Sequence, residues 1–107
     1  LTSRQLKRIL KRTGVGIART GGYTGHGSGE VMIGFTTANR IPSGREEELL
    51  QLSAIPEHVI NRAFLAAAEA EQEAILNSMT AAERTRGLAG ELYYSLAEDL
   101  EDQDSKQ

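Results

Sequence analysis

The chain has 107 residues, a formal net charge of −3 and no cysteine. This length suits one small domain or part of a larger one, and the lack of cysteine excludes disulfides and thiolate catalysis. No apolar run is long enough to span a bilayer and no signal-peptide pattern is present, so we expect a cytoplasmic protein without a membrane partner. Residues 1–20 carry six basic and no acidic groups. Because no aromatic side chain is interleaved for base stacking, we interpret them as a solvated helix face, not as a nucleic-acid site.

The first predicted element is a helix over about residues 2–13, with Thr2 or Ser3 as its N-cap. Leucine, isoleucine and threonine recur there at helical spacing, and Gly14 is the predicted C-cap. We expect a short strand over Val15–Arg19 to follow, with its apolar side chains on one face.

A glycine-rich loop, residues 20–29, comes next. Glycine is entropically costly, so a cluster indicates backbone at positive φ or a close approach to another group. Most of the eleven glycines lie in or near this loop, namely Gly14, Gly16, Gly21, Gly22, Gly25, Gly27, Gly29 and Gly34. We therefore expect a rigid, closely packed loop whose last glycines, Gly27 and Gly29, position Ser28.

Residues 30–38 read as a second strand. Both of its faces are largely apolar, so we expect both to be covered. Ser28 and Glu30 lie at i and i+2 where this strand begins, and extended backbone points both side chains to the same side. A hydroxyl and a carboxylate placed in this way are a candidate catalytic pair.

The second half of the chain is predicted to be mainly helical. A turn at residues 39–44 leads into a charged run and a loop or short helical turn at residues 45–53. Pro56 then begins the longest helix, which extends to about Ala82 and is rich in alanine, so that it can pack closely on a flat surface.

The C-terminal residues carry weaker signals. Gly87 and Gly90 are expected to break the long helix, and residues 92–100 form a weak closing element. An acidic tail spans about residues 98–107, and its acidic residues from Glu98 to Asp104 are expected to be frayed.

These elements predict an α/β fold that is incomplete by itself. Two strands and two or three helices cannot cover a strand that is apolar on both faces. We therefore treat residues 1–107 as a single region that is completed by a partner chain or by sequence outside it.

Five segments together resemble a known family, the self-processing DmpA/BapA-type aminopeptidases, which include L-aminopeptidase/D-esterases and β-peptidyl aminopeptidases. The segments are Gln5-Leu6-Lys7-Arg8, Arg19-Thr20-Gly21, Gly27-Ser28-Gly29-Glu30, Phe35-Thr36-Thr37-Ala38-Asn39 and Glu73-Ala74-Ile75-Leu76-Asn77. The order and spacing of the set, more than any one motif, carry the resemblance.

The resemblance implies a precursor that cuts itself into a larger and a smaller chain. It implies a four-layer αββα sandwich like that of N-terminal-nucleophile hydrolases, and a serine nucleophile at the new N-terminus of the smaller chain. This sequence is similar to the smaller chain without its first strand, so the nucleophile would lie upstream of Leu1. The implied partners are the larger chain, a peptide, amide or ester substrate, and further copies of the two-chain unit in a homo-oligomer.

Two site residues follow from the resemblance. Ser28 matches a serine that contacts the nucleophile, and Glu30 matches the acidic residue two positions later, where many relatives have aspartate. A second hydroxyl can relay the nucleophile's proton, and a carboxylate can orient that relay or hold a cationic amine. Without the resemblance, Ser28 and Glu30 are equally consistent with a turn former and a strand-edge charge.

Other kinds of site fit less well. A phosphate cradle is disfavoured because the loop leads into a strand, lacks a following Gly-Lys-Ser/Thr and carries Glu30. His26 and His58 are isolated, so we expect no metal and no cofactor. The main hypothesis is therefore one chain of a self-processed serine aminopeptidase or amidase. The alternatives are a non-catalytic partner-binding domain, or a relative of the polyamide-oligomer hydrolases with a threonine nucleophile.

Overall fold

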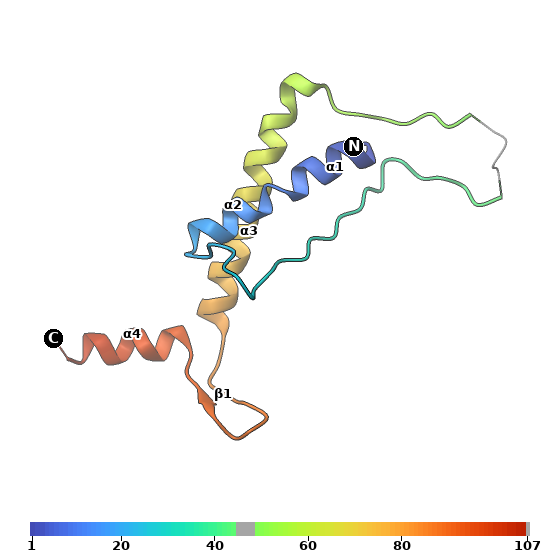
Figure 1. The fold of residues 1–107 in the computed structure, drawn as a ribbon. Coiled ribbons are helices and arrows are strands. Elements are labelled where there is room, and N and C mark those ends of the chain that lie inside the picture. The colour runs from blue at the N-terminus through green and yellow to red at the C-terminus, as the bar shows by residue number, and fades with distance from the viewer. Residues whose placement is uncertain (45–48, 107) are drawn as a thin grey trace. The chain divides into compact units, whose positions relative to one another are not determined.

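The computed structural model describes residues 1–44 and 49–106. Their contacts divide the chain into two units, Leu1–Gln72 and Glu73–Gln107. The charged run at residues 45–48, predicted as a loop or helical turn, lies outside the described residues. Helices and a short sheet are both present (Figure 1), which agrees in general terms with the expected α/β class.

The first unit begins with two short helices. α1 (Ser3–Leu10) starts at Thr2, whose hydroxyl accepts a hydrogen bond from the Gln5 backbone N–H. The Gln5 side chain in turn accepts from the Thr2 N–H, which completes a capping box. The predicted N-cap is confirmed. α1 ends at Leu10, however, which is earlier than predicted.

α2 (Thr13–Arg19) occupies the stretch that was predicted as a C-cap at Gly14 and a strand over Val15–Arg19. Both predictions are wrong. An added Cβ at Gly16 would lie 2.5 Å from the carbonyl oxygen of Ala68 and 2.8 Å from the backbone nitrogen of Gln72. Gly16 therefore allows α2 to cross the long helix that contains Ala68 and Gln72 at close range. A seven-residue run cannot distinguish these cases by periodicity alone.

The long helix confirms its prediction closely. Pro56 precedes a 3₁₀ turn, η1 (Glu57–Val59), which continues into α3 (Ile60–Ala81). Ile60 and Ala68 on α3 are the buried apolar residues of the described chain. Gly16 rests against α3 at Ala68, Glu71 and Gln72, mainly against their backbone and Cβ atoms.

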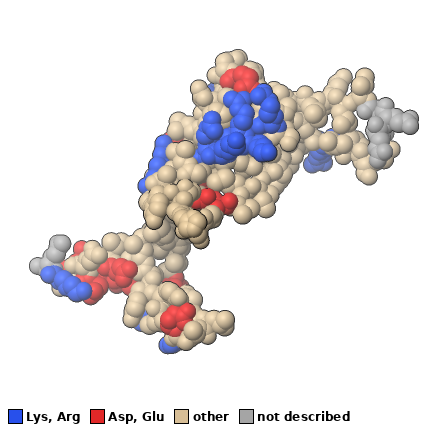
Figure 2. Space-filling model, in the orientation of Figure 1, with Lys and Arg blue, Asp and Glu red and all other residues tan. Residues whose placement is uncertain are grey.

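The basic groups of the N-terminal segment lie partly against the start of the long helix. Figure 2 shows Lys and Arg side chains gathered on one face over α1. Arg4 and Arg8 bind the Glu57 carboxylate at 2.9 and 2.6 Å, while Arg8 and Arg12 lie over the Phe64 ring. The hydrogen bond from Arg8, with the added attraction of Arg4, holds the pKa of Glu57 below its ordinary value of 4.5.

Residues 30–36 are extended (Figure 1) but join no sheet, and residues 37–39 form a bend. In the described chain, the sheet consists of two later strands. The predicted alternation is present on one side, where Met32, Gly34 and Thr36 are half-buried. An added Cβ at Gly34 would lie 2.9 Å from the Leu10 side chain, so this side faces the helices. The opposite side is open, because Val31, Ile33 and Phe35 are 90%, 88% and 84% exposed. The prediction of a strand covered on both faces is therefore not met within residues 1–44 and 49–106, which place neither a neighbouring strand nor a second layer over the open side.

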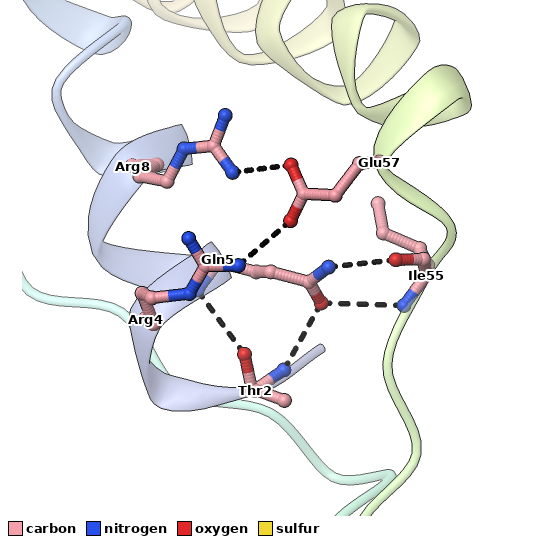
Figure 3. Close-up of polar contacts among 6 residues, drawn as sticks. All are labelled: Thr2, Arg4, Gln5, Arg8, Ile55 and Glu57. Carbon is pink, nitrogen blue, oxygen red and sulfur yellow. Dashed lines mark hydrogen bonds and ion pairs between the residues drawn. The ribbon is translucent and has the colours of Figure 1, made fainter.

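Two side-chain amides hold the segment that leads back to α3. Gln5, which is 3% exposed, donates to the Ile55 carbonyl at 2.6 Å and accepts from the Ile55 N–H at 3.2 Å (Figure 3). Asn39 donates to the Ser53 carbonyl at 2.9 Å and accepts from the Ser53 N–H at 2.7 Å. Each amide thus pairs with both polar groups of one peptide residue, as a neighbouring strand would.

The second unit contains the end of α3, a hairpin and a final helix. Strands β1 (Thr85–Arg86) and β2 (Leu92–Tyr93) pair antiparallel, with Thr85 opposite Tyr93. Gly90 has a φ of +91° in the connecting turn, a value that favours glycine. The prediction that glycines interrupt the helical pattern here is confirmed.

α4 (Leu96–Asp104) forms where a weak element and a frayed acidic tail were expected. Ser95 and Glu98 make a second capping box, and two acidic residues in the first turn suit the positive end of the helix dipole. Hydrogen bonds from the Ser95 N–H and from Arg84 hold the pKa of Glu98 below its ordinary value. The expectation of fraying is therefore wrong, since the acidic residues stabilise the helix start.

None of the helices in the described part of the chain has the length and apolar character needed to cross a bilayer.

Candidate active site

The glycine loop begins with a regular helix ending. The Gly21 N–H donates to the Ala18 carbonyl and the Gly22 N–H to the Ile17 carbonyl, both at 3.1 Å. Gly21 has a φ of +99°. This is the Schellman arrangement, in which a residue of left-handed conformation turns the chain off the helix axis. The loop therefore leaves α2 in a defined direction.

A tight turn over residues 25–28 presents Ser28. The Ser28 N–H donates to the Gly25 carbonyl at 3.1 Å, and the Ser28 hydroxyl donates to the same oxygen at 3.0 Å. Gly27, at the third position of the turn, has a φ of +91°, as a type II turn requires. Because the hydroxyl proton is engaged within the turn, the Ser28 oxygen keeps its lone pairs to accept a hydrogen bond from another group.

Glu30 follows Ser28 by two residues in an extended stretch, and both are exposed. Together with Ile17 and the rest of residues 21–30, they line an open hollow of about 570 Å³. The structure thus brings the two predicted site residues to one hollow. No hydrogen bond joins them among those found for the described residues.

A second, smaller cavity of about 220 Å³ adjoins Glu30. Its apolar lining includes Leu10, Ile17 and Met32, and Glu71 of α3 contributes a second carboxylate. Ile17 and Glu30 line both spaces. The sequence analysis did not predict that Ile17 and Glu71 line these spaces. Recognising residues 13–19 as a helix would have placed Leu10, Thr13 and Ile17 on one side.

The two glycines predicted to position the loop differ in what they require. Gly27 needs its positive φ, which any side chain would strain. A Cβ added at Gly27 or Gly29 would meet nothing within 4 Å in this chain. Close packing around these two positions therefore stays a prediction for the assembled protein.

His26 also lines the hollow. Across residues 1–44 and 49–106, no three His, Asp or Glu side chains come together in the way a metal ion would need. The chemical groups that line this hollow are therefore hydroxyls, the Glu30 carboxylate and the His26 imidazole, on a glycine-rich backbone.

Comparison with known proteins places the chain in a family. The model of peptidase family S58 matches residues 1–93, which include the whole glycine loop and the extended segment. The chain belongs to this family. The resemblance to DmpA/BapA-type aminopeptidases is thereby confirmed.

Two curated relatives are named beta-peptidyl aminopeptidase BapA. The protein of Sphingosinicella microcystinivorans is 34% identical over 86 residues, which are 80% of this chain and 22% of that protein. The protein of Sphingosinicella xenopeptidilytica is 29% identical over 100 residues, which are 92% of this chain and 25% of that protein. The chain therefore spans about a quarter of the length of these relatives.

A solved structure has a closely similar fold. The crystal structure of the PH0078 protein from Pyrococcus horikoshii OT3 matches with a TM-score of 0.86 and 44% sequence identity. The match covers 96% of this chain and 29% of that protein chain.

Proposed function

We propose that this chain is the smaller-chain part of a self-processed serine aminopeptidase or amidase that releases N-terminal residues from peptides, amides or esters. The observation that carries the proposal is the family match over residues 1–93, because it spans the hollow that holds Ser28 and Glu30. The names of the two curated relatives support an aminopeptidase in particular.

The proposed mechanism assigns one role to each residue. A serine hydroxyl that precedes Leu1 is the nucleophile, and it is weak until another group accepts its proton. Ser28 accepts a hydrogen bond from that hydroxyl, as its free lone pairs allow. As it takes up the nucleophile's proton, it releases its own hydroxyl proton from the Gly25 carbonyl to a basic group, either the free α-amino group of the nucleophile or the Glu30 carboxylate. Glu30 orients Ser28 or holds the cationic α-amino group of the nucleophile or the substrate.

The proposed fold is a four-layer αββα sandwich that the larger chain of the same precursor completes. Its support is the open side of residues 30–38, where three large apolar side chains are more than four-fifths exposed. Soluble proteins rarely leave such a row uncovered, and extended backbone needs a neighbouring strand. In this proposal the two-chain unit also assembles into a homo-oligomer.

The test compares four variants of the whole protein. Glu30→Gln keeps the size of the side chain but removes its charge, and turnover should fall about 10²- to 10⁴-fold, the range for a positioned acid–base group. Ser28→Ala should be similarly severe, and Glu30→Asp should be milder. The double variant should be much less than additive, because the two residues act as one unit. The assay is steady-state hydrolysis of an aminoacyl-p-nitroanilide, with thermal melts to confirm folding.

Glu71→Gln is the matched control. It makes the same chemical change on a carboxylate that adjoins the same cavity from α3. It should leave turnover within about threefold, since Glu71 has no place in the proton relay. Near-normal turnover in Glu30→Gln would remove Glu30 from the mechanism and return it to an ordinary charge beside a turn.

The alternatives give different results in simple experiments. A non-catalytic partner-binding domain would hydrolyse no aminoacyl substrate and would show no self-cleavage of the precursor. A relative of the polyamide-oligomer hydrolases would self-cleave before a threonine, which N-terminal sequencing of the smaller product distinguishes from serine. The need for a partner is tested by expressing residues 1–107 alone. A cooperatively melting monomer would contradict it.

A further inference from the structure

Asn39 holds three backbone groups at the end of the extended segment. Its amide nitrogen donates to the Leu1 carbonyl at 2.6 Å and to the Ser53 carbonyl at 2.9 Å, and its oxygen accepts from the Ser53 N–H at 2.7 Å. Two carbonyls and one N–H fix the orientation of the amide, because only the NH₂ group can donate twice. Asn39 is half-buried. It therefore connects Leu1, two residues before the start of α1, to the end of residues 30–38.

The direction of residues 30–38 relative to Leu1 indicates how chain that precedes Leu1 would run. α1 and α2 lead away from Leu1, and residues 30–38 run back until Asn39 reaches Leu1 (Figure 1). Chain that enters Leu1 alongside residues 30–38 would therefore run parallel to them. α1 and α2 would then form the helical crossover by which parallel neighbours are joined.

We propose that Asn39 is a positioning residue that sets the register between residues 30–38 and the chain entering Leu1. The inference rests on the proposed function, in which the nucleophile precedes Leu1. Glu30 and Ser28 precede Asn39 by nine and eleven residues. Parallel strands advance together by about 3.3 Å per residue, so the residue opposite the pair lies about nine to eleven positions before Leu1.

The register between these two strands determines where the reacting groups lie. A slip of one residue moves every side chain of a strand by about 3.3 Å and turns it to the other face. Misplacing a reacting group by about 1 Å can lower the rate about 10²-fold. Loss of the Asn39 hydrogen bonds to Leu1 and Ser53 should therefore lower kcat and slow self-cleavage, with less effect on KM.

Gln5 provides a matched control within the same fold. Its amide donates to the Ile55 carbonyl at 2.6 Å, and its oxygen accepts from the N–H groups of Ile55 and Thr2 at 3.2 and 3.3 Å. Gln5 thus holds the same returning segment as Asn39. Its bonds do not include the Leu1 carbonyl, and Gln5 is the more deeply buried of the two.

The experiment uses the whole protein with Asn39→Asp and Gln5→Glu. Each change keeps the accepting oxygen and removes the donating NH₂ group. Asn39→Asp should lower kcat for an aminoacyl-p-nitroanilide about 10- to 100-fold and slow the appearance of the smaller chain on a gel. Gln5→Glu should leave kcat within about twofold while lowering the melting temperature at least as much. Asn39→Ser, which adds no charge, repeats the test should Asn39→Asp not fold.

A kcat within twofold of normal in the folded Asn39 variants would overturn the positioning role, as would an equal fall of kcat in Gln5→Glu. The proposed function is judged separately by Glu30→Gln. If Glu30→Gln is inactive and the Asn39 variants are normal, the register inference alone fails. If Glu30→Gln is normal, the proposed function itself fails.

Discussion

The two sides of residues 30–38 differ sharply, although both belong to the first unit. On the helix side, Gly34 fits against Leu10, and the amide of Asn39 at the end of the segment pairs with backbone groups of Leu1 and Ser53. On the other side, Val31, Ile33 and Phe35 are exposed. Because one side is packed and hydrogen-bonded, we interpret the exposed side as a surface for contact and not as a result of incomplete folding. The open side is the surface that the rest of the protein is expected to cover, with Ser28 and Glu30 at its start.

The largest effect should come from the open side. Phe35→Ala in the whole protein should lower the free energy of unfolding by about 3–5 kcal/mol, because a covered phenylalanine leaves a cavity when truncated. Leu100→Ala on α4 is the control, since Leu100 is exposed and lies beyond the family match. Urea denaturation measures both. Equal, small changes in the two variants would show that the open side stays exposed.

The packing of α2 on α3 should respond to a single added methyl group. Gly16→Ala should destabilise the protein by about 1–3 kcal/mol, because the new Cβ would press on backbone atoms of α3 that cannot move aside. Gly14→Ala in the same helix meets only the end of the Met32 side chain at 3.8 Å. It should be neutral or stabilising by up to about 1 kcal/mol. If both alanines behave alike in urea melts, the close helix crossing is not what limits stability.

The capping box of α1 should make a smaller contribution. Thr2→Ala removes the hydroxyl that accepts from the Gln5 N–H, and should lower stability by about 1 kcal/mol. Thr2→Ser keeps that hydroxyl and is the matched control. A fall in the chemical-denaturation midpoint for both variants would assign the loss to the threonine methyl group instead.

The smallest effect should be a dependence of stability on acidity. The pKa values of Glu57 and Glu98 are lower in the folded chain than their ordinary value of 4.5. As pH falls below about 4.5, the unfolded chain therefore binds more protons than the folded chain. The stabilisation is complete above that pH and is lost as pH falls through the lowered folded values. Urea midpoints between pH 2 and 7 measure it, and Glu57→Gln should flatten the lower part of the curve. Because these pairs are exposed, added salt should weaken the trend. A midpoint in Glu57→Gln that falls as steeply as in the unchanged protein would contradict the assignment to Glu57.

Parts of the site could be predicted because they depend on neighbours in the sequence. The turn that presents Ser28 needs a glycine at position 27, and extended backbone sends Ser28 and Glu30 to one hollow. Glu71 could not be predicted, because it reaches the cavity next to Glu30 only through the packing of α3. The Thr2-x-x-Gln5 spacing was a readable capping signal, but nothing in it indicated that Gln5 also holds Ile55.

By itself, the sequence determined the long helix that follows Pro56, the N-cap at Thr2 and the family, and it indicated that Ser28 and Glu30 lie at the same hollow. These features follow from local dihedral preferences, side-chain spacing and motif order. Only the tertiary structure decided that residues 13–19 form a helix, because Gly16 is explained by the surface of Ala68 and not by its neighbours in sequence. The tertiary structure also decided that Asn39 meets Leu1. By contrast, α4 follows a local capping signal, Ser95-x-x-Glu98, which the prediction of a frayed tail overlooked. Contacts between distant residues set the helix at residues 13–19 and the contact of Asn39 with Leu1, and a short stretch of sequence does not record such contacts.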